Sequence, residues 1–409
     1  MSTIPMPFRP SVCALGDLTF PGLRLAATRW LVIVSFVCPF FNFELLVPSS
    51  TVEVNFLLIF LAALLLPEVT LQDHRAILLA LPVFAIALIG ASPTACARLA
   101  IGMLPLHFLI NLTRTLRARG EDILPPNLAY RSLQVFVVFC AVQTVQLNYF
   151  HILPDFVVNI LVAVVPRYST VPYDALGVHG VQGWASEPSS AALICIAFAV
   201  IAIHQRPERR WSVLAWYVVL LLLNKSIYAT VLTVLLMVGC LMTLRHKLYA
   251  ILALIPSSLV VLMYLTLSQR VSKLRTNLLI DGLNSDANHE LARFVQILSP
   301  LQQFPHVYKP VILFGSWVME PMGLLPLLVG YGSVLGAVWL FYILRHNFSL
   351  SPVSMRPMAL IALFVLLIMS APDLIPSILA VVIFLVPRHA SSSPALADPT
   401  SRLRTCKEF

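Results

Sequence analysis

Charged residues are scarce in this chain, and their scarcity excludes an ordinary soluble domain. Only 11% of the 409 residues are charged, while 59% are hydrophobic. Charged residues usually make up about a quarter of a soluble domain. Apolar runs instead recur at the length needed to cross a bilayer, roughly 20 residues. The composition therefore predicts an integral membrane protein.

Motifs for metals, nucleotides and disulfides are also missing. The seven cysteines fall in or beside apolar runs or in the tails, and no C-x-x-C occurs, so neither a disulfide framework nor a thiolate metal site is expected. The sequence has no Asp-x-Asp pair and no Gly-x-x-x-x-Gly-Lys loop. Its net charge of +9 is spread in short clusters between apolar runs, unlike the basic face of a nucleic-acid binder. We therefore expect no metal, no cofactor and no nucleic-acid partner.

The apolar runs predict an all-α, polytopic helical membrane protein of about 10–12 transmembrane spans. The predicted spans are 30–48, 51–67, 76–92, 95–112, 129–150, 189–204, 211–224, 226–244, 248–268, 322–344, 358–371 and 373–387. The pairs 211–224 with 226–244 and 358–371 with 373–387 are short, so each pair is either two spans or one kinked helix. Residues 1–387 form a single predicted membrane domain, and residues 388–409 form a cytoplasmic tail expected to be disordered.

Basic residues mark alternate connections between the predicted spans, as they do in cytoplasmic loops. With twelve spans, both termini lie in the cytoplasm and every basic cluster falls on the cytoplasmic side. Two long loops, about 151–188 and 269–321, then lie on the outer side of the membrane.

The first outer loop holds the most chemically informative segment of the chain. Arg167, His179, Gly183, Glu187 and Ser189 lie in a polar, glycine-containing stretch that leads into the next predicted span. A carboxylate at the membrane boundary is well placed to lose its hydration and act as a base, so Glu187 is a candidate catalytic residue. The alternative is that this stretch only caps the following helix.

Arg270, Arg275 and Arg293 lie in the second outer loop, where positive charge runs against the orientation rule. Arginine recognises phosphate through its planar fork of donors, so these residues are candidates for binding an anionic substrate. The alternative is that they have no such role, because long loops are partly exempt from the rule.

Three ionisable residues in or beside the spans need separate interpretation. Arg98 lies near the outer end of a predicted span, where ionisable groups are usually functional or paired. Lys225 lies between Asn224 and Ser226; it is either a substrate-binding cation or a snorkelling charge at a helix end. His107 lies deeper in the apolar sequence and is predicted to be a packed core histidine.

The order of these elements resembles that of the lipid-linked polysaccharide polymerase and ligase superfamily of bacterial envelopes, which includes O-antigen polymerases, exopolysaccharide polymerases and O-antigen ligases. The resemblance covers about residues 130–345. Its parts are Arg167, Gly183 and Glu187-Pro188-Ser189; Asn224-Lys225-Ser226; and Arg270, Arg275 and Arg293 with Gly315. Members of that superfamily often have a His just before the span that follows the second loop. Glu320 is the nearest titratable residue here, so the identity of the base stays open.

The resemblance implies a metal-independent glycosyltransferase of the bacterial inner membrane. It would polymerise or ligate polyprenyl-pyrophosphate-linked oligosaccharides on the outer face, with membrane lipid, a chain-length regulator and a flippase protein as further partners. Arg167 and Arg293 would stabilise the departing pyrophosphate. Glu187 or Glu320, or His179 or His289, would take the proton of the acceptor hydroxyl.

A transporter or flippase of a lipid-linked or anionic solute is the main alternative. Such a protein needs polar groups along an inner pathway and often has internal repeats. The sequence has few charges within the predicted spans and no evident repeat, and its polarity is concentrated in the outer loops. These features favour chemistry near the membrane surface over transport, and over a structural scaffold.

Overall fold

The computed structural model describes residues 20–38, 42–43, 52–90, 93–145, 181, 183–185, 188–224, 226–243, 324–348, 355–369 and 375–386. This part of the chain is all-helical apart from one short two-stranded ladder. The helices are α1 (Phe20–Val37), α2 (Val54–Leu65), α3 (Pro67–Thr70), α4 (His74–Gly90), α5 (Pro93–Ala118), α6 (Leu128–Val145), α8 (Pro188–Gln205), α9 (Arg210–Asn224), α10 (Ile227–Met242), α15 (Leu324–Phe348), α16 (Arg356–Phe364) and α17 (Ile375–Leu385). A 3₁₀ turn, Pro207–Arg209, precedes α9, and a π-helical turn, Val365–Met369, continues α16.

Most predicted spans coincide with helices, and the two ambiguous pairs are resolved. The pair 211–224 and 226–244 forms separate helices, α9 and α10, and the pair 358–371 and 373–387 forms α16 and α17. The predicted span 248–268, the tail, the whole second outer loop and most of the first outer loop lie outside the described residues. Two helical stretches in the described part, Leu99–Ala118 and Leu128–Val145, are long and apolar enough to cross a membrane.

The first predicted span, 30–48, has the wrong bounds. The helix there, α1, begins at Phe20 and ends at Val37. The helix ends before Pro39 because a proline ring disfavours helical geometry in the residue before it. Further on, β1 (Asn42–Phe43) pairs antiparallel with β2 (Val52–Glu53), just before α2.

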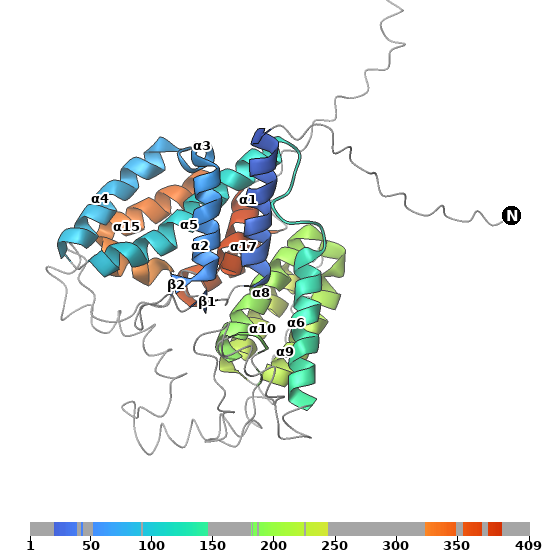
Figure 1. The fold of residues 1–409 in the computed structure, drawn as a ribbon. Helices are drawn as coiled ribbons and strands as arrows, with labels where there is room; N and C mark the ends of the chain where they lie inside the picture. The colour runs from blue at the N-terminus through green and yellow to red at the C-terminus, as the bar shows by residue number, and fades with distance from the viewer. Residues whose placement is uncertain are drawn as a thin grey trace, which may run out of the picture.

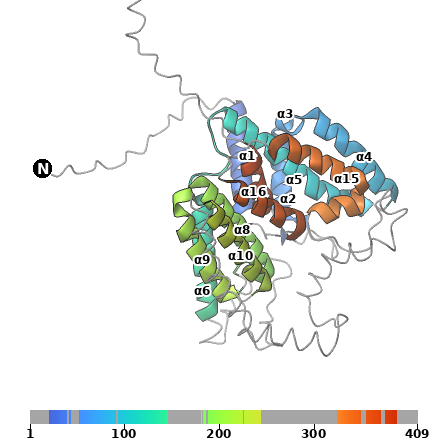
Figure 2. The ribbon, with the colours of Figure 1, turned by 180° about the vertical axis from the view of Figure 1, so that it is seen from behind.

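The helices gather into two groups, and α17 packs against helices of both. Helices α6, α8, α9 and α10 form one group, and α1, α2, α4, α5 and α15 form the other, with α17 between them (Figure 1; Figure 2 shows the same arrangement from behind). Every residue from Ala191 to Ile203 of α8 is buried, as is every residue of α17. Edge-to-face contacts of Phe36 with Phe198 and of His204 with Phe384 join the groups.

Basic residues converge at one end of the helices, which we call the basic end. The segment between α5 and α6 supplies several of their partners. Arg29 of α1 donates to the Ile123 carbonyl at 3.4 Å and lies 3.3 Å from the Glu121 carboxylate. Arg209 donates to Asn127 at 3.3 Å, and Arg117 donates to the Ile383 carbonyl at 3.3 Å. Arg29, Arg117 and Arg209, from three connections that the sequence assigns to one side of a membrane, therefore lie at the same end of the helices.

Large apolar side chains cover the outward faces of the helices. Leu78, Val135 and Phe341 are each at least 60% exposed, and similar residues recur on α1, α2, α9 and α16. A water-soluble protein rarely leaves contiguous apolar surface of this extent uncovered.

Helix α15 is broken at Ser333, whose φ of 57° and ψ of −157° are not helical. Across this break Gly336 packs directly on the backbone of the preceding segment, because a Cβ at Gly336 would collide with the Leu328 carbonyl. Only glycine fits this close approach.

We expect Gly336→Ala to destabilise the protein by about 1–3 kcal/mol, because a backbone carbonyl cannot move aside as a side chain can. The measurement is the thermal unfolding midpoint of the detergent-solubilised protein. Gly239→Ala is the matched control, since its Cβ would meet only the flexible ends of Ile361 and Met358, at 2.5 and 2.8 Å. Equal midpoints for the two variants would contradict the proposed fit at Gly336.

Candidate functional site

Three of the predicted site residues fall within the described part of the chain. Gly183 lies in the short segment before α8, Ser189 in the first turn of α8, and Arg98 in the first half of α5. The other predicted site residues lie outside the described residues: Arg167, His179, Glu187, Lys225, Arg270, Arg275, Arg293 and Glu320. Among the described site residues, Gly183 has the best-defined surroundings.

The backbone of Gly183 is held by one side-chain amide. Gln143, in the last turn of α6, donates from Nε2 to the Gly183 carbonyl at 2.9 Å. The Gly183 N–H in turn donates to Gln143 Oε1 at 2.9 Å. Gln143 is only 3% exposed, so these two bonds satisfy backbone groups that water does not reach. We call this pair of hydrogen bonds the Gln143–Gly183 clamp.

Only glycine fits at position 183. Its φ is +62°, a conformation that other residues rarely adopt. A Cβ would also lie 2.7 Å from the Phe136 ring and 3.2 Å from Cys140 Sγ. The next residue, Trp184, packs edge to face on Phe136 and Phe139, with ring centroids 4.5 and 5.5 Å apart. Packing of the ring and the absence of a side chain at Gly183 together fix this segment on α6.

Asn224, the first residue of the Asn224-Lys225-Ser226 motif, is hydrogen-bonded to the same segment. Asn224 Nδ2, at the last residue of α9, donates to the Val181 carbonyl at 2.8 Å. The Val181 N–H points back to the Leu223 carbonyl at 3.5 Å. Asn224 and Ser226 are both buried. Two elements that the sequence singled out forty residues apart thus lie in direct contact.

The contacts define a second end of the bundle, which we call the clamp end. It contains the last turns of α6 and α9, the segment 181–185, and the start of α8 at Pro188. Helices α6 and α9 both run from the basic end to the clamp end, because Tyr130 and Ser212 near their starts are hydrogen-bonded at 2.7 Å. In the sequence, Glu187 immediately precedes Pro188 and Lys225 immediately follows Asn224. The described neighbours of these two candidates, Pro188 and Asn224, therefore both lie at the clamp end.

Gln143 is the residue that the sequence interpretation missed. The available signal was an amide side chain within an apolar stretch of predicted span, because buried polar groups are kept where they have partners. His107, in contrast, lies where a packed histidine was predicted. Its Nε2 is 3.1 Å from the carbonyl of Thr70, the last residue of α3, and this contact ties α5 to α3. The same nitrogen is 3.2 Å from Asn111 Nδ2 within α5.

Within the described ranges, no group of three His, Cys, Asp or Glu side chains is placed to hold a metal ion. Comparison with models of protein families, with curated proteins and with solved structures finds no match to this chain.

We expect Gln143→Met to release the segment 181–185 from α6. Met has a similar shape but makes neither hydrogen bond, so a buried N–H and a buried carbonyl of Gly183 lose their partner, at a cost of about 1–3 kcal/mol. The measurement is limited proteolysis by chymotrypsin, with cleavage after Trp184 becoming faster.

Gln134→Met on the same helix is the matched control, since Gln134 is only half-buried. Its cleavage rate should equal that of the unmodified protein. Unchanged cleavage after Trp184 in Gln143→Met would show that the clamp does not hold the segment.

Proposed function

We propose that this chain is an inner-membrane glycosyltransferase that polymerises or ligates polyprenyl-pyrophosphate-linked oligosaccharide units on the outer face of the membrane. One observation carries the proposal. The segment with Gly183, the start of α8 and the Asn224 side chain meet at one end of the bundle, opposite the basic end.

Membrane embedding is the first part of the proposal. The apolar outward faces of the helices and the two long apolar helices support it. Cations concentrated at one end support an orientation, because positively charged connections stay in the cytoplasm. The basic end is then cytoplasmic, and the clamp end faces the outer leaflet, where the pyrophosphate of a flipped lipid-linked sugar would lie.

The proposed chemistry is a displacement at the anomeric carbon of the donor sugar. The acceptor hydroxyl oxygen forms the new glycosidic bond while the bond from the anomeric carbon to the pyrophosphate oxygen breaks. The lipid pyrophosphate leaves with the bonding electron pair, and the hydroxyl proton passes to a base. Glu187 is the first candidate for that base, with Glu320 and His179 as alternatives.

Arginines suit the leaving group in this scheme. Arg167 and Arg293 would bind the pyrophosphate as its charge develops, with Arg270 and Arg275 contributing to substrate binding. Lys225, Ser189, Gly183 and Arg98 are proposed to position the donor. The clamp supports this role for the first-loop residues, because it fixes the segment 181–185 from which Glu187 follows.

The orientation is tested by accessibility of single cysteines in a cysteine-free background. Cysteines at positions 178 and 285 should react in intact cells with a thiol reagent that cannot cross the membrane. Cysteines at positions 118 and 208, at the basic end, should react only after the membrane is opened. The reverse pattern would overturn the proposed orientation and the outer location of the site.

The chemistry is tested by Glu187→Gln. The amide keeps the size of the side chain and can still accept a hydrogen bond, so loss of capping should cost at most about 1 kcal/mol. It cannot take a proton at neutral pH. We expect the variant to be inserted at normal levels but to leave lipid-linked units unpolymerised in an envelope-polysaccharide gel.

Glu208→Gln, at the exposed basic end, is the control and should give ladders of normal length. Normal ladders from Glu187→Gln as well would show that Glu187 is a cap and not the base.

A further inference from the structure

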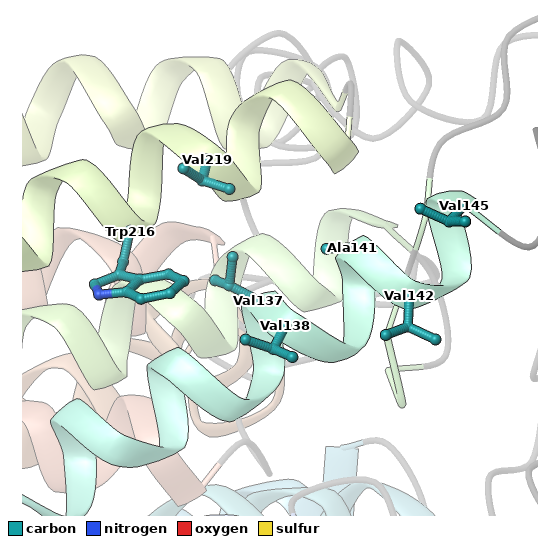
Figure 3. A pocket seen from close by; sticks show the side chains of 7 residues that line it. All are labelled: Val137, Val138, Ala141, Val142, Val145, Trp216 and Val219. Atoms are coloured by element: carbon teal, nitrogen blue, oxygen red, sulfur yellow. The ribbon is translucent and has the colours of Figure 1, made fainter.

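An apolar groove runs along the outward side of the contact between α6 and α9. Its volume is about 340 Å³, and its walls are Val137, Val138, Ala141, Val142 and Val145 of α6 with Trp216 and Val219 of α9. Figure 3 shows the side chains of the two helices along this groove. Val138, Val142 and Val145 are about half exposed, so the groove is open to the surroundings of the bundle.

Two arginines lie at the basic end of this same contact. On α6, Arg131 precedes Val138 by seven residues and Val142 by eleven, which places all three on one face of the helix. Arg209, just before α9, lies with its guanidinium 5.3 Å from the centre of the Tyr130 ring. Tyr130 is next to Arg131 in the sequence, so both arginines lie at the same end of the contact between α6 and α9.

Arg131 is available for a ligand as the structure stands. Its side chain is exposed, and within the described residues no side-chain hydrogen bond or ion pair involves it. The Tyr130 hydroxyl, by contrast, is bonded to Ser212 at 2.7 Å. That bond joins α6 to α9 near Arg131 and Arg209, which we call the rim. The groove begins on the side of this bond that faces the clamp end.

The spacing of the rim and the groove fits one phospholipid. At a rise of about 1.5 Å per residue, Val138 lies about 10 Å and Val142 about 16 Å along α6 from Arg131. The hydrocarbon of one leaflet is about 15 Å deep. A phosphate bound at Arg131 would therefore place an acyl chain alongside Val138 and Val142.

We propose that the rim formed by Arg131 and Arg209 and the groove below it bind an anionic glycerophospholipid of the cytoplasmic leaflet. The phosphate is held by the two guanidinium groups, and one acyl chain lies against the valines and Trp216. Charge complementarity at the rim selects an anionic over a zwitterionic headgroup. This site rests on the membrane embedding proposed above and is independent of the glycosyl-transfer chemistry at the opposite end.

The test uses the purified full-length protein with a phosphatidylglycerol that carries a photoreactive group in the middle of one acyl chain. Adducts are mapped by mass spectrometry of peptides from α6 and α9. We expect labelling near Val138 and Trp216, and weaker labelling by the phosphatidylcholine probe with the same chain. Each cation near a membrane surface contributes about fivefold in affinity for anionic lipid, so Arg131→Gln should reduce labelling about fivefold.

Two further variants separate the headgroup from the acyl chain. Ala141→Phe fills the groove and should reduce labelling without touching the arginines. Arg345→Gln, an exposed cation on the last turns of α15, should leave labelling unchanged. Retention of the detergent-solubilised elution profile checks that each variant is folded.

Three outcomes would overturn the proposal. One is equal labelling by the phosphatidylglycerol and phosphatidylcholine probes. The second is loss in Ala141→Phe without loss in Arg131→Gln, which would mean that the groove takes any hydrocarbon chain. The third is equal displacement of the probe by a polyprenyl phosphate in the unmodified protein and in Arg131→Gln, which would assign the groove to a chain entering from the clamp end. Polymer formation is not part of these readouts, so a failed glycosyltransferase assay leaves this test intact.

Discussion

Burial of α8 from Ala191 to Ile203 is the constraint on which the rest of the structure depends. From Ala191 to Ile203 every side chain is covered, by α6, α9 and α10 on one side and by α16 and α17 on the other. A helix without an exposed face cannot rotate or slide without creating cavities, each of which costs free energy. The start of the helix at Pro188 is therefore held in place.

The Gln143–Gly183 clamp extends this fixed position to the segment before α8. An isolated amide within an apolar helix would be unfavourable unless both of its polar ends were bonded. Here both are bonded to the same backbone residue, and Asn224 holds Val181 two residues earlier. At the clamp end, polar groups are therefore held in place by hydrogen bonds within the protein. A preorganised site differs from a solvated loop in this respect.

Sequence patterns predicted where most of the helices lie, but they could not predict which contacts hold the helices together. Apolar runs locate α4, α5, α6 and α8 to within several residues, because a helix in an apolar environment must be apolar at nearly every position. The same uniformity hides which face packs inward, so neither the Gln143–Gly183 clamp nor the buried course of α8 was predictable from periodicity. The bounds of α1 were wrong because the run through Val47 is as apolar as the helix, and only Pro39 marks the break.

The contact between α6 and α9 is tied at both ends, by the Tyr130–Ser212 hydrogen bond at the basic end and by the Val181–Gly183 segment that bridges Gln143 and Asn224 at the other. Hydrogen bonds at both ends restrain the two helices from separating. A lipid in the proposed groove would therefore enter laterally from the membrane and would exchange by lateral diffusion, without passing between the helices.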